Sequence, residues 1–148
     1  MRHILLELTL TVVLLLPFSA MSHHSGPAVY NPDKIGEIEG VLTKMLWRNP
    51  HISFNLAVPD ENGQTTSWLV EGGSPARLQR RGVEKDFLKI GDTIKIAGQL
   101  ARSGEPRLRV TNVLLPTGEE LLTLSDRAPL RWNTNEVIGK GNLSIDES

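Results

Sequence analysis

From Ile35 onward, apolar and polar residues alternate in short runs, which is typical of β-strands with one buried face. The first run, residues 35–47, is rich in β-branched side chains and carries Gly36 and Gly40, where a strand can bend. In the next run every second residue is apolar: Ile52, Phe54, Leu56 and Val58. Asn62-Gly63 then predicts a hairpin turn, because these residues tolerate the positive φ angles of tight turns, and residues 65–71 return as the partner strand.

One short helix interrupts the strands. Ser74 is a good N-cap, Pro75 suits the first helical position, and Gly82 ends a helix expected over residues 74–81. Three further strands follow, over residues 91–100, 108–115 and 119–122. Residues 125–148 have little periodicity and read as an irregular C-terminal tail.

The order of these elements predicts an all-β fold, a small five-stranded OB-like barrel with the helix between strands 3 and 4. The barrel domain is expected over residues 35–124, and a different small barrel or a β-sandwich is the alternative. Gly91-Asp92 followed by an alternating strand that ends at Gly98 resembles the fourth strand of many OB domains. The side chains expected inside are Ile38, Phe54, Leu56, Val70, Ile94, Ile96 and Val110.

The first 22 residues have the pattern of a cleavable export signal. Arg2 precedes an apolar run over residues 8–16 that Pro17 ends, and this run is too short to cross a bilayer as a helix. Ala20 and Ser22 are small residues at the positions that signal peptidases prefer, which makes His23 the first mature residue. Cleavage after Ala20 is the alternative. We therefore expect a periplasmic or secreted protein with no stable membrane anchor, and residues 23–34 as an N-terminal arm.

Charge and cysteine content narrow the function. The formal net charge of −1 argues against a general nucleic-acid-binding protein, which usually carries a basic excess. The chain has no cysteine, which excludes disulfides, thiolate metal sites and thiol catalysis. It also lacks the motifs of nucleophilic catalysis, phosphate loops and dinucleotide binding, so an enzyme is not indicated.

Several short motifs together resemble a family of small exported bacterial proteins that is known only as a domain of unknown function. They are His23-His24-Ser25, residues 40–44, Trp47-Arg48-Asn49-Pro50-His51, residues 60–63, Trp68, Glu71-Gly72-Gly73, Arg80-Arg81-Gly82, Gly91-Asp92 and residues 115–118. The resemblance covers roughly residues 23–122. It implies export and a single small domain, and it implies no activity.

Three histidines remain after signal cleavage and suggest a metal site. If His23 is the N-terminus, its amine and imidazole can chelate one ion, and His51 or His24 can add another imidazole. Nitrogen-rich sets of this kind favour Cu(II). If cleavage follows Ala20, His23 becomes the third residue, an arrangement that also binds Cu(II). The alternatives are that His23 and His24 form a solvated end and that His51 only hydrogen-bonds the backbone.

A second hypothesis needs no metal. Trp47 and Trp68 could form a stacking platform on the barrel face, and the glycines after Glu71 could let the backbone approach a small ligand, a glycan or a periplasmic protein. Alternatively, the tryptophans pack in the core or at its rim, and Gly72-Gly73 only makes a turn. A copper-dependent oxidative enzyme is a third alternative, because a terminal histidine also serves such chemistry.

Overall fold

The computed structural model describes residues 26–132, 134 and 136–139, and it is mostly β. Two short helices, α2 (Gly26–Val29) and α3 (Pro75–Arg80), accompany seven strands. The strands are β1 (Tyr30–Leu46), β2 (Ser53–Pro59), β3 (Thr65–Glu71), β4 (Thr93–Ala101), β5 (Arg107–Leu114), β6 (Glu120–Leu122) and β7 (Val137–Ile138). The prediction of an all-β fold is confirmed, as is the short helix between the third and fourth strands. No helix in the described part of the chain is long and apolar enough to cross a membrane.

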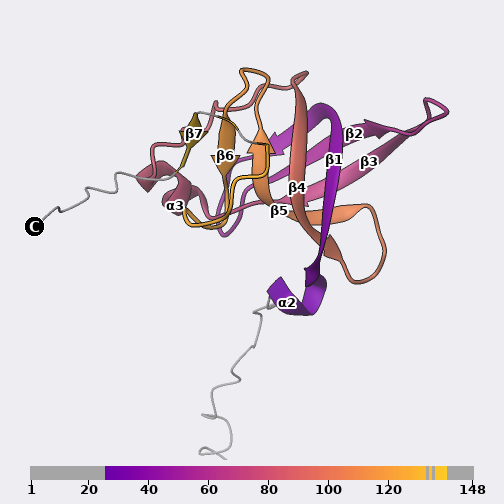
Figure 1. Ribbon diagram of the computed structural model, residues 1–148, viewed down its shortest axis with the longest axis horizontal. Coiled ribbons are helices and arrows are strands. Elements are labelled where there is room, and N and C mark those ends of the chain that lie inside the picture. The colour runs from indigo at the N-terminus through magenta and orange to yellow at the C-terminus, as the bar shows by residue number, and fades with distance from the viewer. Residues whose placement is uncertain (1–25, 133, 135, 140–148) are drawn as a thin grey trace, which may run out of the picture.

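Five of the strands pair in a closed ring. The long strand β1 pairs antiparallel with β2 through its second half and with β4 through its first half. β2 pairs antiparallel with β3, and β4 with β5. The ring closes where β3 and β5 run parallel over residues 69–71 and 107–109. The later half of β5 stays paired with β4 and on its other edge pairs with β6, which pairs with β7 (Figure 1).

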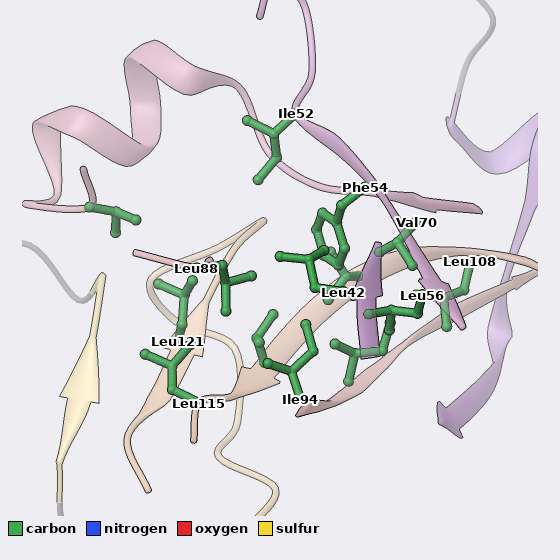
Figure 2. Packing of buried hydrophobic residues seen from close by; sticks show 14 of the residues in the cluster. Leu42, Ile52, Phe54, Leu56, Val70, Leu88, Ile94, Leu108, Leu115 and Leu121 are labelled. Carbon is green, nitrogen blue, oxygen red and sulfur yellow. The ribbon is translucent and has the colours of Figure 1, made fainter. Parts of the chain in front are cut away.

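The interior of the ring is filled by the alternating apolar residues of every strand. On β2, Phe54 and Leu56 point inward, while Ser53 and Asn55 alternate with them and are only partly buried. Figure 2 shows these side chains packed against those of the other strands and of the segment after α3. Six of the seven side chains predicted to lie inside are buried, and the seventh, Ile38, is partly buried and packs against the cluster.

The predicted turns form for the expected reason. Gly63 closes the β2–β3 hairpin at φ 77°, and Gly82 follows α3 at φ 78°, a region that side chains with a Cβ rarely adopt. Pro75 begins α3 as predicted. Ser74 precedes it, but its hydroxyl makes no capping hydrogen bond, and its carbonyl accepts the amides of Arg77 and Leu78 instead.

The chain is ordered further toward both ends than the sequence pattern indicated. β1 begins at Tyr30, not Ile35, and a register shift between these residues accommodates the intervening polar segment. Part of the predicted arm, residues 23–34, is therefore helix α2 and the start of β1. Within the predicted irregular tail, residues 125–148, the structure adds the short strand β7.

Candidate functional site

A hollow of about 280 Å³ lies beside Trp68, between the start of β1, the strand β3 and the β4–β5 hairpin. Its lining residues are Asn31, Lys34, Trp68, Leu100, Ala101, Arg102, Gly104 and Glu105. Trp68 is partly buried: it packs against the hydrophobic core and also lines this hollow. This is the one residue predicted to bind a ligand that lines the hollow.

Backbone contacts hold the hairpin that forms one wall of this hollow. The Arg102 amide donates to the carbonyl of Val29 (2.9 Å), and Arg102 Nε donates to the carbonyl of Pro27 (2.9 Å). On the other side, the amide of Leu69 donates to the carbonyl of Pro106 (3.0 Å). The hairpin is thus fixed to α2 and to β3, and the hollow is a preformed feature of the fold.

Gly36 allows Leu100 to form the apolar floor. A Cβ at residue 36 would lie 2.5 Å from Leu100 Cδ2, so the glycine leaves room for this leucine, whose side chain would have to shift beside a larger residue. Trp68 and Leu100 give the hollow an apolar surface, while Lys34, Arg102 and Glu105 give it charged edges. An apolar surface with a few polar groups around it is the usual character of a small-ligand site.

A second cluster joins Glu71 to Arg107 and Tyr30. Arg107 Nη2 donates to the Glu71 carboxylate, and Arg107 Nε donates to the Tyr30 hydroxyl at 2.8 Å. The Arg107 guanidinium also lies over the Tyr30 ring, 5.5 Å from its centroid. Burial, with a smaller contribution from the adjacent Glu71 carboxylate, raises the pKa of the Tyr30 hydroxyl far above its ordinary value. Glu71 is therefore engaged within the protein, and its predicted contact with a ligand stays a prediction.

The cluster also anchors the N-terminal arm. Tyr30 is 2% exposed, because α2 and the β4–β5 strands enclose it. A Cβ at residue 26 would run into Arg109 Nη1, so Gly26 lets the arm lie directly against that guanidinium. Sequence reasoning missed this anchoring, since Tyr30 and Arg107 are 77 residues apart and neither stands in a recognisable motif.

Trp47 and Trp68 are both partly buried and both pack against the hydrophobic core, but Trp47 does not line the hollow. Its ring meets that of Phe87 edge-on, with centroids 5.8 Å apart, and it packs against the hydrophobic core. No stacking contact joins Trp47 to Trp68 within the part of the chain that the structure describes. The contacts of Trp47 are those of packing at the rim of the core.

The predicted metal ligands are only partly within the described residues. His51 is exposed in the loop before β2, beside Ile52, whose amide donates to the carbonyl of Gly73 (3.0 Å). His23 and His24 lie outside the described residues. Within residues 26–132, 134 and 136–139, no three His, Cys, Asp or Glu side chains gather closely enough to hold a metal ion.

Comparison with known proteins supports the resemblance derived from the motifs. A family model described as "Family of unknown function (DUF6152)" matches residues 12–108, from before α2 to the start of β5. A search among curated proteins finds no significant match.

Proposed function

The chain belongs to this family of unknown function, and on that premise we propose that it is an exported, OB-type module that binds a small ligand beside Trp68. One observation carries the proposal: the hollow combines a partly exposed tryptophan with charged groups on a hairpin that the fold holds in place.

The strand order supports the OB assignment. The ring runs β1-β2-β3-β5-β4, with α3 between β3 and β4. OB domains bind oligosaccharides and oligonucleotides on the face of their second and third strands, beside the loop between the fourth and fifth. Trp68 belongs to β3 and Gly104 to the β4–β5 loop, a strand and a loop that OB domains use for binding, and this supports the proposal.

A glycan is the ligand class that fits best. A sugar ring has an apolar face, which could stack on Trp68, and hydroxyl groups that could bond to Lys34, Arg102 or Glu105 at the edges. The hollow contains two cations and one anion, and the whole chain is nearly neutral, so a polyanion such as a nucleic acid is a poor match.

The proposal is tested by comparing glycan binding of the wild type with that of variants on β3. We expect an array of bacterial glycans to yield a ligand whose titration shifts the amide resonances of residues 100–105. Trp68→Ala should weaken binding about tenfold or more, because stacking on one aromatic ring is worth about 1–3 kcal/mol. Trp68→Phe should restore part of it, and Ser67→Ala, an exposed neighbour on β3, should bind as the wild type does.

Two results would contradict this function. One is the absence of saturable binding by any glycan on the array. The other is binding that Trp68→Ala leaves unchanged.

Export is tested separately. Intact-mass measurement and N-terminal sequencing of protein from a periplasmic extract should find a chain that begins at His23. A chain with residues 1–22 still attached, recovered from the cytoplasm, would refute export.

Copper binding is the second candidate, supported by the anchoring of the arm. Gly26 lies against Arg109, which pairs with Glu71 across β5 and β3, and Glu71 pairs with Ser53 on β2. The spacing between β5 and β3 and the spacing between β3 and β2 together amount to roughly 10 Å. His51 precedes Ser53 by two residues, and three residues of extended chain before Gly26 can span roughly 10 Å. The proposal requires the mature terminus to cover this distance together with the length of the Arg109 side chain and the two residues from Ser53 to His51.

In this candidate function, the amine and imidazole of His23 bind Cu(II), His51 is the third ligand and His24 its competitor. Copper titration of correctly processed protein should show tight binding that one added N-terminal residue weakens strongly and His51→Ala weakens less. Equal affinity in all three proteins would refute it.

A further inference from the structure

Three arginines surround a second hollow, which lies between α3 and the segment after β6. This hollow measures about 310 Å³ and is lined by Arg77, Arg80, Arg81, Leu124, Ser125 and Asp126. Its lining comes from α3, from Arg81 after it and from the segment after β6, and it shares no lining residue with the hollow beside Trp68.

Arg81 is held rigidly in this hollow. Its Nη2 donates to the carbonyl of Thr123 at 2.8 Å. That carbonyl belongs to a residue that β5 holds, because the Thr123 amide donates to the carbonyl of Thr111 (2.9 Å) and the Thr123 hydroxyl donates to the carbonyl of Val110 (2.5 Å). The guanidinium of Arg81 is therefore preorganised by β5 and the segment after β6.

Arg81 nonetheless has unused hydrogen-bond donors. Its Nε and Nη1 are shielded from solvent and have no partner in the described part of the chain. Leaving a buried donor unpaired costs free energy, and more so for a charged group. Burial lowers the pKa of Arg81, the charge of nearby Asp126 opposes this effect, and the positive charge of Arg77 adds to it.

The charge in the hollow is unbalanced. Asp126 is the one acidic residue in its lining, against three arginines. None of these arginines forms an ion pair within 4 Å among the described residues. Basic residues in the last turn of a helix are favoured by the helix dipole, which accounts for Arg77 and Arg80. The dipole does not account for the unpaired nitrogens of Arg81, which lies beyond the last turn.

We propose that this hollow binds a phosphate group. A tetrahedral oxyanion accepts hydrogen bonds from several guanidinium groups at once, and arginine presents its donors in the planar arrangement that such recognition requires. Arg81 supplies a fixed positive charge at the wall of the hollow, and its shielded Nε and Nη1 reach the anion only when the guanidinium turns toward it. The exposed Arg77 and Arg80 contact the anion from α3. The phosphate could belong to a soluble molecule or to a phospholipid headgroup, and the chemistry is the same for both.

Inorganic phosphate is the first probe. Titration of the full mature chain at constant ionic strength, with chloride as the balancing anion, should shift the amide resonances of residues 77–81 and 124–126 saturably. The double variant Arg77→Ala/Arg80→Ala should lower the phosphate affinity about tenfold, since it removes two charge-assisted contacts. The double variant Lys44→Ala/Arg48→Ala, which removes two exposed cations elsewhere, should change the affinity less than about twofold.

Arg81→Lys tests the contribution of Arg81. It keeps the positive charge but loses the planar donor set, so we expect phosphate affinity to fall while the dispersed spectrum of the folded protein remains. If Arg81→Lys fails to fold, the Arg77→Ala/Arg80→Ala variant still tests the proposal, because both of its substitutions are at exposed positions.

Sedimentation with vesicles distinguishes the two sources. If the natural ligand is a headgroup, phosphatidylglycerol vesicles should sediment the wild type and the Lys44/Arg48 variant but not the Arg77/Arg80 variant. If it is a soluble phosphate, vesicles should sediment none of them while inorganic phosphate still binds. The proposal is overturned if phosphate gives no saturable shift, or if the Arg77/Arg80 and Lys44/Arg48 variants lose affinity equally.

Discussion

Glu71 and Arg107 form an ion pair across the parallel β3–β5 seam, the pairing that closes the five-stranded ring. The backbone pairing at this seam is short, with residues 69–71 aligned to residues 107–109. The side-chain pair adds to it and reaches Tyr30 through Arg107 Nε. One arginine therefore links the closure of the ring to the anchoring of the N-terminal arm.

The first prediction concerns the free energy of this ion pair. A double-mutant cycle with Glu71→Gln and Arg107→Met, measured by urea unfolding, should give a coupling energy of about 1 kcal/mol. Both side chains are partly shielded, at 29% and 32% exposure, and the guanidinium is fixed by Tyr30.

The matched control for that cycle is the pair Glu37–Lys95, whose atoms lie 2.9 Å apart and whose side chains are 39% and 35% exposed. Solvent screens this pair more, so its coupling should be below about 0.5 kcal/mol. Equal coupling energies in the two cycles would show that the seam pair has no special role.

The second prediction is a loss of stability at alkaline pH that depends on Tyr30. Burial first, and Glu71 second, raise the pKa of its hydroxyl in the folded protein above the unfolded value of about 10. The unfolded chain thus releases this proton at a lower pH than the folded chain. The free energy of unfolding contributed by Tyr30 is complete below pH 10 and should fall as the pH rises above it.

The tyrosinate absorbance measures this directly, because Tyr30 is the single tyrosine of the chain. In the native protein the band should appear only with unfolding, whereas in guanidinium it should appear near pH 10. Lysines titrate in the same range, so Tyr30→Phe is the control and should flatten the alkaline decline in part. Titration of the native protein near pH 10 would contradict the prediction.

Most of the ring could be predicted from local sequence. Alternation on β2, the positive φ of Gly63 and the Pro75–Gly82 helix signals each depend on residues close in the chain, and each was found. The start of β1 could not be predicted in this way. Residues 31–34 do not alternate, and only the register shift between Tyr30 and Ile35 keeps them within the strand.

The candidate sites were less predictable, because they depend on contacts between distant residues. Trp68 was singled out as part of a possible stacking platform, with packing at the core as the alternative. The hairpin that completes its hollow follows some 30 residues later, and its Arg102 bonds to Pro27 of the arm. Glu71 was singled out for its glycines, while its actual partner is Arg107. The Arg80-Arg81-Gly82 motif was noted, but nothing local indicates that Arg81 is partly buried against Thr123.

The third prediction concerns the core. Phe54 is 1% exposed and packs at the centre of the hydrophobic cluster (Figure 2), so Phe54→Ala should lower the free energy of unfolding by about 3–5 kcal/mol. The control Val41→Ala changes a side chain that is 40% exposed and should cost about 1 kcal/mol or less. Similar costs for the two variants, measured by urea unfolding, would show that Phe54 is not a core residue.

The last prediction concerns Glu120, a fully buried acidic side chain that fastens the segment after β6. Its carboxylate accepts the amides of Arg131 (3.0 Å) and Trp132 (3.3 Å) and the side-chain amide of Asn112 (2.6 Å). Glu120→Gln keeps the shape but replaces one acceptor oxygen by an NH₂ group, which must face other donors. We expect it to cost about 1–3 kcal/mol and to release residues 129–132. Hydrogen exchange should show lost protection at the amides of Arg131 and Trp132, together with loss of the β6–β7 pairing that follows in the chain.

Glu119→Gln is the control, because Glu119 is partly exposed and its carboxylate accepts a hydrogen bond from the nearby Thr117 hydroxyl. If Glu120→Gln left the protection of both amides intact, the order of this segment would have to come from packing of Leu130 and Trp132 and not from the buried carboxylate.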